Sequence, residues 1–309
     1  MTPPVLRVGT RGSALALAQT GQVAKAIVAA MGFGTVELVR IRTEGDVNTG
    51  ALATIGGTGV FVTAVREALR SGEVDLVVHS FKDLPTATAD GIALSAVPVR
   101  ADPADALCAR GGLTLAELPK AAKVGTGSPR RMAQLLSLRS DLDVVPVRGN
   151  VNTRLARVGP TDLDAVLLAA AGLRRLGLQA AISEQFDPTR FLPAPAQGAL
   201  AVECRTDDIP WFAAGLAAID DPASRWAAIA ERAVLAGLEA GCSAPVSALA
   251  TIAGGAASVS AQVASADGAT VLRQNATAAV ADDASASAAG QSLADELLAA
   301  GAAELMGSS

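Results

Sequence analysis

One stretch of the sequence combines arginines with residues that favour the start of a helix. Ser128 and Pro129, followed by Arg130 and Arg131, come after a β-rich run and a glycine turn. Ser128 is a favourable N-cap, and proline suits the first helical position, where its missing N–H costs nothing. The free amides and the positive dipole end of such a helix, beside two guanidinium groups, would bind an anion. The same residues are equally typical of an ordinary capped helix with solvated arginines.

Two more arginine-bearing turns follow β-rich runs. Arg11-Gly12-Ser13 makes a similar strand–turn–helix start, and Arg148-Gly149-Asn150, with Arg154 following, makes a third. Three such turns in a chain of net charge −5 predict a small polyanionic ligand. Planar guanidinium groups favour carboxylates or phosphates.

A carboxylate also follows a strand that is expected in the centre of a sheet. His79–Pro85 (HSFKDLP) runs off the end of the run Asp75–His79. Asp83, beside Lys82, could be a catalytic carboxylate, but an isolated Asp at this place is more often an N-cap or turn residue. His79, the one histidine in the sequence, is more often a packing residue than a base. A Ser-His-Asp triad is therefore not supported.

The cysteines differ in their predicted surroundings. Cys242 follows a helix expected to end at Gly241, so it falls on a loop, where a thiol can react. Cys108 and Cys204 lie in strand-like runs and are expected to be inert small hydrophobes. An odd number of widely separated cysteines indicates neither a disulfide framework nor a metal site. The glycine-rich stretch 44–59 fits either a mobile lid or an ordinary surface loop.

The elements that must position these residues alternate between β-rich and helical patterns from Val5 to about Ala218, which predicts parallel sheets covered by helices. The expected strands fall into two sets: Val5–Gly9, Val36–Arg42 and Asp75–His79, then Lys123–Gly125, Asp143–Val147 and Asp164–Ala170. A faint repeat relates Gly9–Ser13 to Gly125–Ser128, which suggests two similar lobes. Such a protein would bind its ligand beyond the carboxyl ends of its strands.

The last ninety or so residues have a different pattern. A helix is expected over Pro222–Ala240, followed by three alternating runs that predict a small antiparallel meander. These runs are Val246–Ala253, Ser258–Ala264 and Thr270–Ala276. The Ala/Ser stretch 276–289 is expected to be a surface loop with a helix start. One closing helix would then carry Leu293, Leu297, Leu298 and Leu305.

Length and composition exclude several classes of protein. The 309 residues exceed a single core of ordinary size, so we expect two or three domains. A half-hydrophobic chain with 18% charged residues is globular and not disordered. Without a basic excess and with 3% aromatic residues, a general nucleic-acid binder is not expected. Apolar runs such as Ala165–Ala171 fall short of the ~18 residues that span a bilayer, and we expect a cytoplasmic protein without membrane partners.

Several longer blocks resemble the porphobilinogen deaminase family, whose members are also called hydroxymethylbilane synthases. The similarity runs in order from about residue 5 to the C-terminus, and each block is specific. The blocks are Arg7–Gln19 (RVGTRGSALALAQ), His79–Pro85 (HSFKDLP), Val124–Arg131 (VGTGSPRR), Arg148–Arg154 (RGNVNTR), Ala171–Leu178 (AGLRRLGL), Leu192–Arg205 (LPAPAQGALAVECR) and Glu231–Pro245 (ERAVLAGLEAGCSAP).

This resemblance implies an α/β fold with three domains. Two doubly wound lobes would resemble those of periplasmic binding proteins, with the first formed by residues 1–98 and 194–218 and the second by 99–193. Residues 219–309 would form a small C-terminal α/β domain with a three-stranded antiparallel sheet. The resemblance also implies a monomer.

The resemblance further implies a chemistry. Four porphobilinogen molecules would be condensed head to tail with loss of ammonia on a dipyrromethane cofactor, which is linked to Cys242 through a thioether. Hydrolysis would release hydroxymethylbilane, the substrate of uroporphyrinogen-III synthase. Each pyrrole carries an acetate and a propionate, so the growing chain is a polyanion. This agrees with the arginine-rich turns.

The site residues that the resemblance implies are one catalytic group and a set that binds carboxylates. Asp83 would be catalytic, stabilising the cationic intermediate and assisting proton movement. The binding set is Arg11, Ser13, Lys82, Thr126, Ser128, Arg130, Arg131, Arg148, Arg154, Arg175 and Gln197.

The sequence departs from the family at three of its positions. Thr54 and Thr58 stand where many members have lysines, which puts contacts between this loop and carboxylates in doubt. Gly127 replaces a frequent serine and removes one hydroxyl donor. The competing class is a non-enzymatic anion receptor or a regulator's effector domain, which would need neither Asp83, a loop cysteine nor a third domain.

Overall fold

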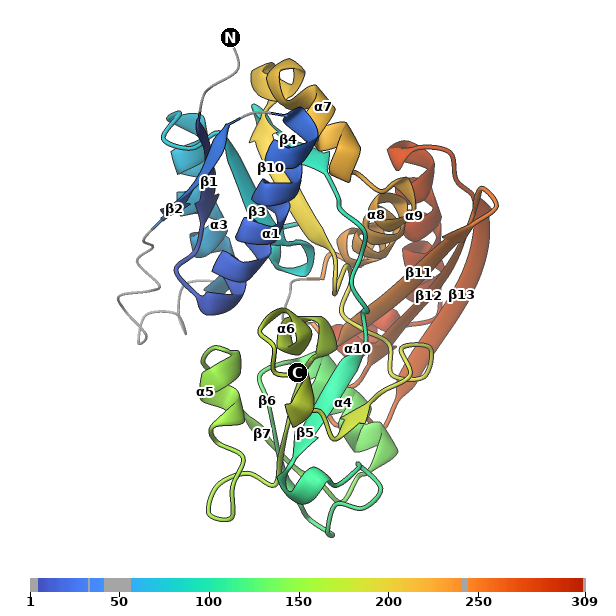
Figure 1. Cartoon of the computed structure of the whole chain (residues 1–309). Helices are drawn as coiled ribbons and strands as arrows, with labels where there is room; N and C mark the ends of the chain where they lie inside the picture. Colours follow the sequence, from blue (N-terminus) through green and yellow to red (C-terminus); the bar gives the residue numbers. More distant parts are fainter. Residues whose placement is uncertain (1–4, 33, 42–56, 241–243, 308–309) are drawn as a thin grey trace. The chain divides into compact units, whose positions relative to one another are not determined.

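The computed structural model describes residues 5–32, 34–41, 57–240 and 244–307 (Figure 1). The chain divides into two compact units. The first comprises Met1–Arg100 and Ala199–Arg225, and the second comprises Ala101–Gly198 and Trp226–Ser309. The second unit holds two separate sheets. The three-domain boundaries implied by the family resemblance stay a prediction.

The first unit is built on a five-stranded sheet in the order β2-β1-β3-β10-β4. Its strands are β1 (Val5–Thr10), β2 (Thr35–Arg40), β3 (Leu76–Ser80), β4 (Ile92–Ala96) and β10 (Leu200–Arg205). β1 runs parallel to β2 and β3, whereas β10 is antiparallel to both of its neighbours. The expectation of a parallel sheet was therefore wrong for β10, the first strand after the chain re-enters this unit.

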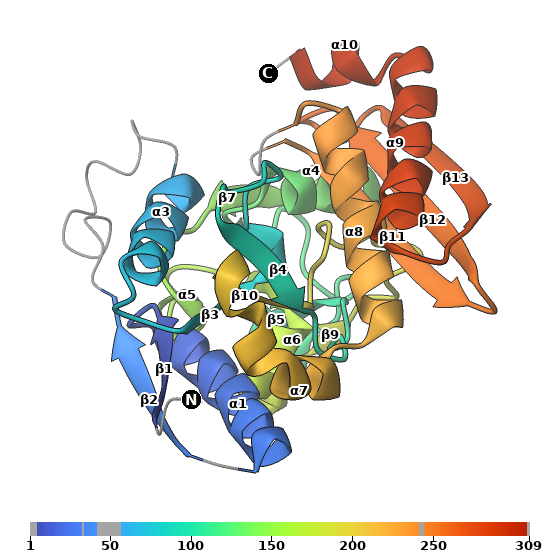
Figure 2. The ribbon, with the colours of Figure 1, turned by 90° about the horizontal axis from the view of Figure 1, so that it is seen from above.

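Helices cover both faces of this sheet because β3 is apolar on both sides. Leu76 and Val78 pack with helices α1 (Ala14–Met31) and α7 (Ile209–Ile219), whereas Val77 packs with α3 (Gly57–Arg70) on the opposite face. Figure 2 shows α7 beside α1 on one face and α3 away from them. By length and composition alone α1 could cross a membrane, but it supplies Val23, Ala24 and Ile27 to this core.

The second unit begins with another five-stranded sheet, in the order β7-β6-β8-β5-β9. Its strands are β5 (Asp105–Ala109), β6 (Lys123–Thr126), β7 (Asp143–Pro146), β8 (Ala165–Ala169) and β9 (Glu184–Gln185). β6 is parallel to β7 and β8, and β5 is antiparallel to β8 and β9. Its helices are α4 (Pro129–Leu138), α5 (Val151–Leu155) and α6 (Ala170–Arg175). Both sheets thus share one plan, as the faint sequence repeat suggested.

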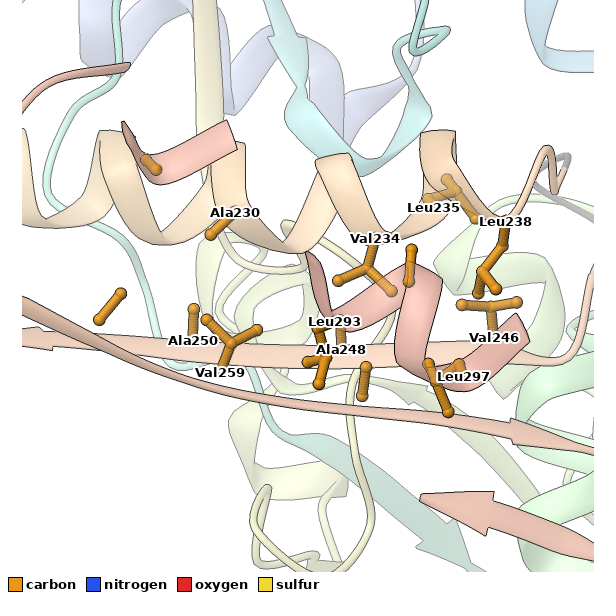
Figure 3. Packing of buried hydrophobic residues seen from close by; sticks show 14 of the residues in the cluster. Ala230, Val234, Leu235, Leu238, Val246, Ala248, Ala250, Val259, Leu293 and Leu297 are labelled. Carbon is orange, nitrogen blue, oxygen red and sulfur yellow. The ribbon is translucent and has the colours of Figure 1, made fainter. Parts of the chain in front are cut away.

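The C-terminal part of the second unit contains the predicted antiparallel meander of β11 (Val246–Ala253), β12 (Ala256–Ala264) and β13 (Val271–Ala279). Helices α8 (Pro222–Gly237) and α9 (Asp283–Ala299) contribute to one apolar core with this sheet. Figure 3 shows Val234 of α8, and Leu238 just after this helix, pointing toward the strand that carries Val246 and Ala248. Short 3-10 turns occur at Phe81–Asp83, Arg110–Gly112, Gln179–Ala181 and Thr206–Asp208.

Three details of this part differ from the sequence expectations. α8 ends at Gly237 and not at Ala240, since Glu239 adopts a left-handed conformation with φ 50°. β13 continues to Ala279, and a capping box at Asp282 starts α9 directly afterwards, so the stretch expected to be a loop is mostly regular. The single closing helix is two, because Gly301 (φ 95°) separates α9 from α10 (Ala302–Gly307).

Candidate active site

The first unit has a small pocket of about 110 Å³ at the carboxyl ends of β1 and β3. These strands are parallel neighbours, so the segments that follow them meet at the same edge of the sheet. The polar residues that line the pocket are Thr10, Arg11, Ser13, Gln19, His79, Ser80 and Asp83. The structure therefore brings together three residues predicted from the sequence: Arg11, Ser13 and Asp83.

The start of α1 has the geometry that its sequence predicts. The Ser13 hydroxyl accepts a hydrogen bond from the Ala16 amide at 3.2 Å, as an N-cap does. The neighbouring Thr20 hydroxyl donates to Thr10 at 2.9 Å, and the Ser80 hydroxyl donates to Gln19 at 3.2 Å. Thr10, Gln19 and Ser80 were not predicted as site residues. Their side chains tie β1, α1 and β3 together at the pocket.

Asp83 lies at the end of the 3-10 turn that follows β3. Ser80, and not Asp83, occupies the N-cap position of this turn, so Asp83 is a turn residue and not an N-cap. Phe81 and Leu84 are buried on either side, whereas Lys82 and Asp83 are half-buried. The turn is thus anchored by apolar side chains and presents its carboxylate to the pocket.

Behind this pocket, His79 contacts a buried carboxylate that the sequence analysis missed. His79 Nε2 lies 3.2 Å from Glu203 Oε2, and Arg66 binds the same carboxylate through Nε at 3.0 Å and Nη2 at 2.6 Å. Burial alone would raise the pKa of Glu203, but His79 and Arg66 outweigh it and hold the pKa at about 2. A single acidic residue inside the apolar strand LAVECR was the available signal.

In the second unit, the two arginines at the start of α4 are buried around Asp105. Arg130 Nη2 lies 2.8 Å from Asp105 Oδ2, while Arg131 donates to Asp105 Oδ1 through Nε at 3.0 Å and Nη2 at 2.7 Å. Gln197 Nε2 donates to the same oxygen at 2.8 Å, and its own Oε1 lies 3.4 Å from Arg131 Nη2. Leu192 O accepts from Arg130 at 2.8 Å. These arginines are therefore neither solvated nor exposed.

This cluster, consisting of Asp105, Arg130, Arg131 and Gln197, carries more positive than negative charge. Burial would raise the pKa of Asp105, but the two guanidinium groups and the hydrogen bonds hold it at about 2. Burial lowers the pKa of Arg130. Two guanidinium groups share one carboxylate, and within the described part of the chain Arg130 Nε is buried without a hydrogen-bond partner. An additional carboxylate would satisfy both the charge and this N–H.

The turn before α4 also contacts the segment after β7. Ser128 caps α4 by accepting from the Arg131 amide at 3.4 Å, and the Thr126 hydroxyl accepts from the Ser128 amide at 3.2 Å. A Cβ on Gly127 would lie 2.6 Å from Val147 O and 3.9 Å from Arg154 Nη1. A side chain at position 127 would therefore have to displace the segment after β7.

The other predicted arginines have different surroundings. Arg154 Nε donates to Gly149 O at 2.7 Å, and Arg148 is exposed just beyond β7. Arg175 donates to Gly198 O at 2.8 Å, and burial lowers its pKa. That all the arginines serve one ligand stays a prediction.

Several predicted features fall outside the described residues. Cys242 and Thr54 lie there, together with most of the glycine-rich stretch 44–59, whereas Thr58 falls in the first turn of α3. Cys108 and Cys204 are buried in β5 and β10, as predicted. Burial raises the pKa of Cys108 to about 11, which keeps it a thiol.

The sequence matches two family models in succession. Residues 6–211 match the porphobilinogen deaminase, dipyromethane cofactor binding domain, and residues 226–299 match the porphobilinogen deaminase C-terminal domain. Porphobilinogen deaminase of Leifsonia xyli is 54% identical over 97% of this chain and 94% of its own length. Porphobilinogen deaminase 1 of Streptomyces avermitilis is 52% identical over 99% of both chains.

Among solved structures, the methionine-binding protein MetQ has 10% sequence identity and a TM-score of 0.46, over 70% of this chain and 90% of its own. This likeness is too distant to bear on function. The two family models and the similarity to full-length relatives, in contrast, cover both units described above. The chain belongs to the porphobilinogen deaminase family.

Proposed function

We propose that this chain is a hydroxymethylbilane synthase that condenses four porphobilinogen molecules head to tail, releasing ammonia at each addition. The observation that carries the proposal is the buried cluster around Asp105, in which two arginines share one carboxylate. This cluster lies inside the region that matches the cofactor-binding family model. Its charge suits a ligand rich in carboxylates.

The residues present fit the dipyrromethane cofactor of the family. Among the described residues, Arg130 offers a buried N–H without a hydrogen-bond partner, and the start of α4 adds the positive end of a helix dipole. We assign carboxylate binding to the predicted set, with Arg130 and Arg131 in the cluster and Thr126, Ser128 and Arg154 at the adjoining turn. When bound, the cofactor supplies the pyrrole end to which substrate is added. Cys242 is the proposed attachment point.

Asp83 is the proposed catalytic residue. Loss of ammonia from porphobilinogen breaks a C–N bond and leaves a methylenepyrrolenine cation. The Asp83 carboxylate accepts hydrogen bonds from pyrrole N–H groups and stabilises that positive charge as it develops. It also assists transfer of a proton to the departing amine and removal of one from the attacked ring carbon. Arg11, Ser13 and Lys82 bind substrate carboxylates beside it.

We further propose that the protein works as a cytoplasmic monomer, and that its unstable linear product passes to uroporphyrinogen-III synthase. The support is the chemistry of the family reaction. A non-enzymatic anion receptor, the alternative function, would need neither Asp83 nor a loop cysteine.

The covalent cofactor gives the first test. Protein purified from cells that make porphobilinogen should be heavier than its sequence by one dipyrromethane, and Cys242→Ala should lack this mass. Cys108→Ala and Cys204→Ala, which change buried thiols, should retain it. An unmodified wild-type mass would contradict the proposal and favour a receptor.

Asp83→Asn gives the second test, because Asn keeps the shape and one acceptor oxygen but removes the charge. Losing such electrostatic stabilisation typically costs ~10²–10³ in rate. Cofactor-loaded Asp83→Asn should melt like wild type and bind porphobilinogen, yet add the first pyrrole very slowly in a single-turnover experiment. Near-normal addition would remove Asp83 from the mechanism.

A further inference from the structure

A buried carboxylate of the C-terminal part contacts the segment that carries Gln197. Glu231 lies on α8 and has no exposed surface. Its Oε1 accepts a hydrogen bond from the Ala250 amide of β11 at 2.7 Å, and its Oε2 accepts one from the Ala196 amide at 2.6 Å. All three residues belong to the second unit. Figure 3 shows where α8 passes over β11, at Ala230 and Ala250.

The segment that Glu231 holds has an unfavourable backbone conformation. Ala196 is buried with φ 61°, in the left-handed region that residues with a Cβ rarely adopt. Gly198 follows with φ 89°, and a Cβ there would lie 2.3 Å from Ala101 O. The Gln197 amide closes the turn by donating to Ala194 O at 2.9 Å. Such strain persists only where the surroundings impose it, and the hydrogen bond to Glu231 is one such restraint.

This turn places Gln197 in the Asp105 cluster. Gln197 is 1% exposed, and its Nε2 donates to Pro103 O at 2.7 Å and to Asp105 at 2.8 Å. The next residue, Gly198, accepts a hydrogen bond from Arg175 at 2.8 Å. The backbone conformation at Ala196 therefore sets the position of Gln197, which is proposed to bind carboxylates. It also sets the position of the Gly198 carbonyl, to which Arg175 donates its hydrogen bond.

We infer that Glu231 is a positioning residue for the cofactor and substrate site: its carboxylate holds Ala196 in the left-handed conformation and thereby keeps Gln197 against Asp105 and Arg131. Release of the Ala196 amide lets φ return to negative values and withdraws Gln197 from the cluster. The inference rests on the proposed role of this cluster in binding carboxylates. It makes the C-terminal part contribute to that site through Glu231, independently of cofactor attachment.

Glu231→Gln tests this inference. The NH2 group of the new side chain cannot accept a hydrogen bond, yet it must face the amide of either Ala196 or Ala250. We expect cofactor loading, followed by intact mass after incubating the apo protein with porphobilinogen, to slow by about tenfold, the size typical of losing a hydrogen bond to a charged group. Gln197→Ala should show a similar loss. The double variant should lose no more than either single one, since both remove the same contact.

Rescue separates positioning from general stability. Adding Ala196→Gly to Glu231→Gln should restore most of the loading rate, because glycine adopts the left-handed conformation without strain. Glu184→Gln is the matched control, since Glu184 Oε2 on β9 also accepts a backbone hydrogen bond at 2.6 Å, but from Leu115 and not from the turn that carries Gln197. It should load like wild type. If Glu231→Gln does not fold, Glu231→Asp, which keeps the charge but shortens the reach, replaces it in every comparison.

The outcomes are distinct. Losses that multiply in the double variant, a Glu231 variant that loads like wild type, or a failed rescue by Ala196→Gly would each overturn the inference. Wild-type protein that never gains the mass of the cofactor would instead contradict the proposed function.

Discussion

At the scale of single residues, the protein keeps two interior carboxylates ionised by placing cationic partners beside them: two arginines at Asp105, and one arginine with His79 at Glu203. Glu203 is 4% exposed and Asp105 is fully buried, yet the pKa of each is held at about 2. Removing one partner from such a pair leaves a buried charge uncompensated. The two groups should therefore make stability sensitive to both acid and mutation.

Acid should destabilise the protein through Glu203. Its folded-state pKa of about 2 lies below the ordinary value of 4.5, so its stabilisation is complete above the ordinary value and is lost as the pH falls toward 2. The free energy of unfolding, measured with denaturant at several pH values, should drop across this window. Glu203→Gln should show a shallower drop, with the remainder due to Asp105 and the other carboxyl groups whose pKa is lowered in the folded protein. An unchanged pH dependence would contradict the low pKa.

Arg131→Leu should impair both stability and cofactor loading. It removes two hydrogen bonds to Asp105 and the positive excess of the cluster. Arg130 still compensates the charge of Asp105, so the expected cost is that of hydrogen bonds to a charged group, ~1.5–3 kcal/mol. Arg110→Leu, which removes a partly exposed contact with Asp164, should cost at most about 1 kcal/mol and load normally. Denaturant unfolding and intact mass measure both effects, and full loading by Arg131→Leu would exclude it from the site.

At the scale of elements, the site depends on how closely the turn before α4 approaches the end of β7. Gly127 allows this approach, and Ser128 then caps the helix that carries the two buried arginines. The same turn brings Arg154 near Gly127. Any side chain at position 127 would force either the turn before α4 or the segment after β7 to move.

Gly127→Ser should therefore destabilise this protein. The new Cβ would lie 2.6 Å from Val147 O, and overpacking of this kind typically costs ~1–3 kcal/mol. Gly159→Ser is the control, because a Cβ there meets no atom within 4 Å among the described residues. Thermal melting should fall for the first variant and hardly change for the second. Equal melting temperatures for the two variants would mean that the segment after β7 moves aside at little cost.

At the scale of the whole molecule, direct contacts within the second unit join α4, the helix that carries Arg130 and Arg131, to the C-terminal three-stranded sheet. The turn between β12 and β13 meets α4, where a Cβ on Gly268 would lie 2.3 Å from Ala133 O. Gln134 of α4 also donates to Ser247 at 3.2 Å, and the Ala248 amide donates to Pro193 O at 3.1 Å. The C-terminal sheet therefore supports the helix that presents the arginines.

Gly268→Ala should weaken this support. Gly268 and Gly254 both have positive φ, at 72° and 57°, but a Cβ on Gly254 meets no described atom within 4 Å. Both substitutions to Ala add backbone strain, and Gly268→Ala adds the overlap with α4. It should therefore lower the free energy of unfolding by at least about 1 kcal/mol more than Gly254→Ala. Equal losses of unfolding free energy in the two variants would show that the turn between β12 and β13 can move away from α4 at little cost.

Local patterns predicted many of the helices and strands that surround the candidate site. Capping residues and glycine turns predicted the starts of α1 and α4, and alternation predicted the C-terminal meander. These patterns failed where contacts between distant segments determine the structure. One example is the antiparallel direction of β5 and β10. Strand direction depends on where the chain enters a sheet, which local periodicity does not record.

The sequence by itself determined which family the chain resembles and that Asp83 and several arginines follow strands or open helices. Only the tertiary structure decided the partners of these residues: Asp105 between Arg130 and Arg131, Glu203 behind His79, and Glu231 on the turn of Gln197. The physical reason is that a buried charge must be compensated by whichever group the fold brings within hydrogen-bond distance. Asp105 and Gln197 are 92 residues apart in sequence, and no local pattern connects them.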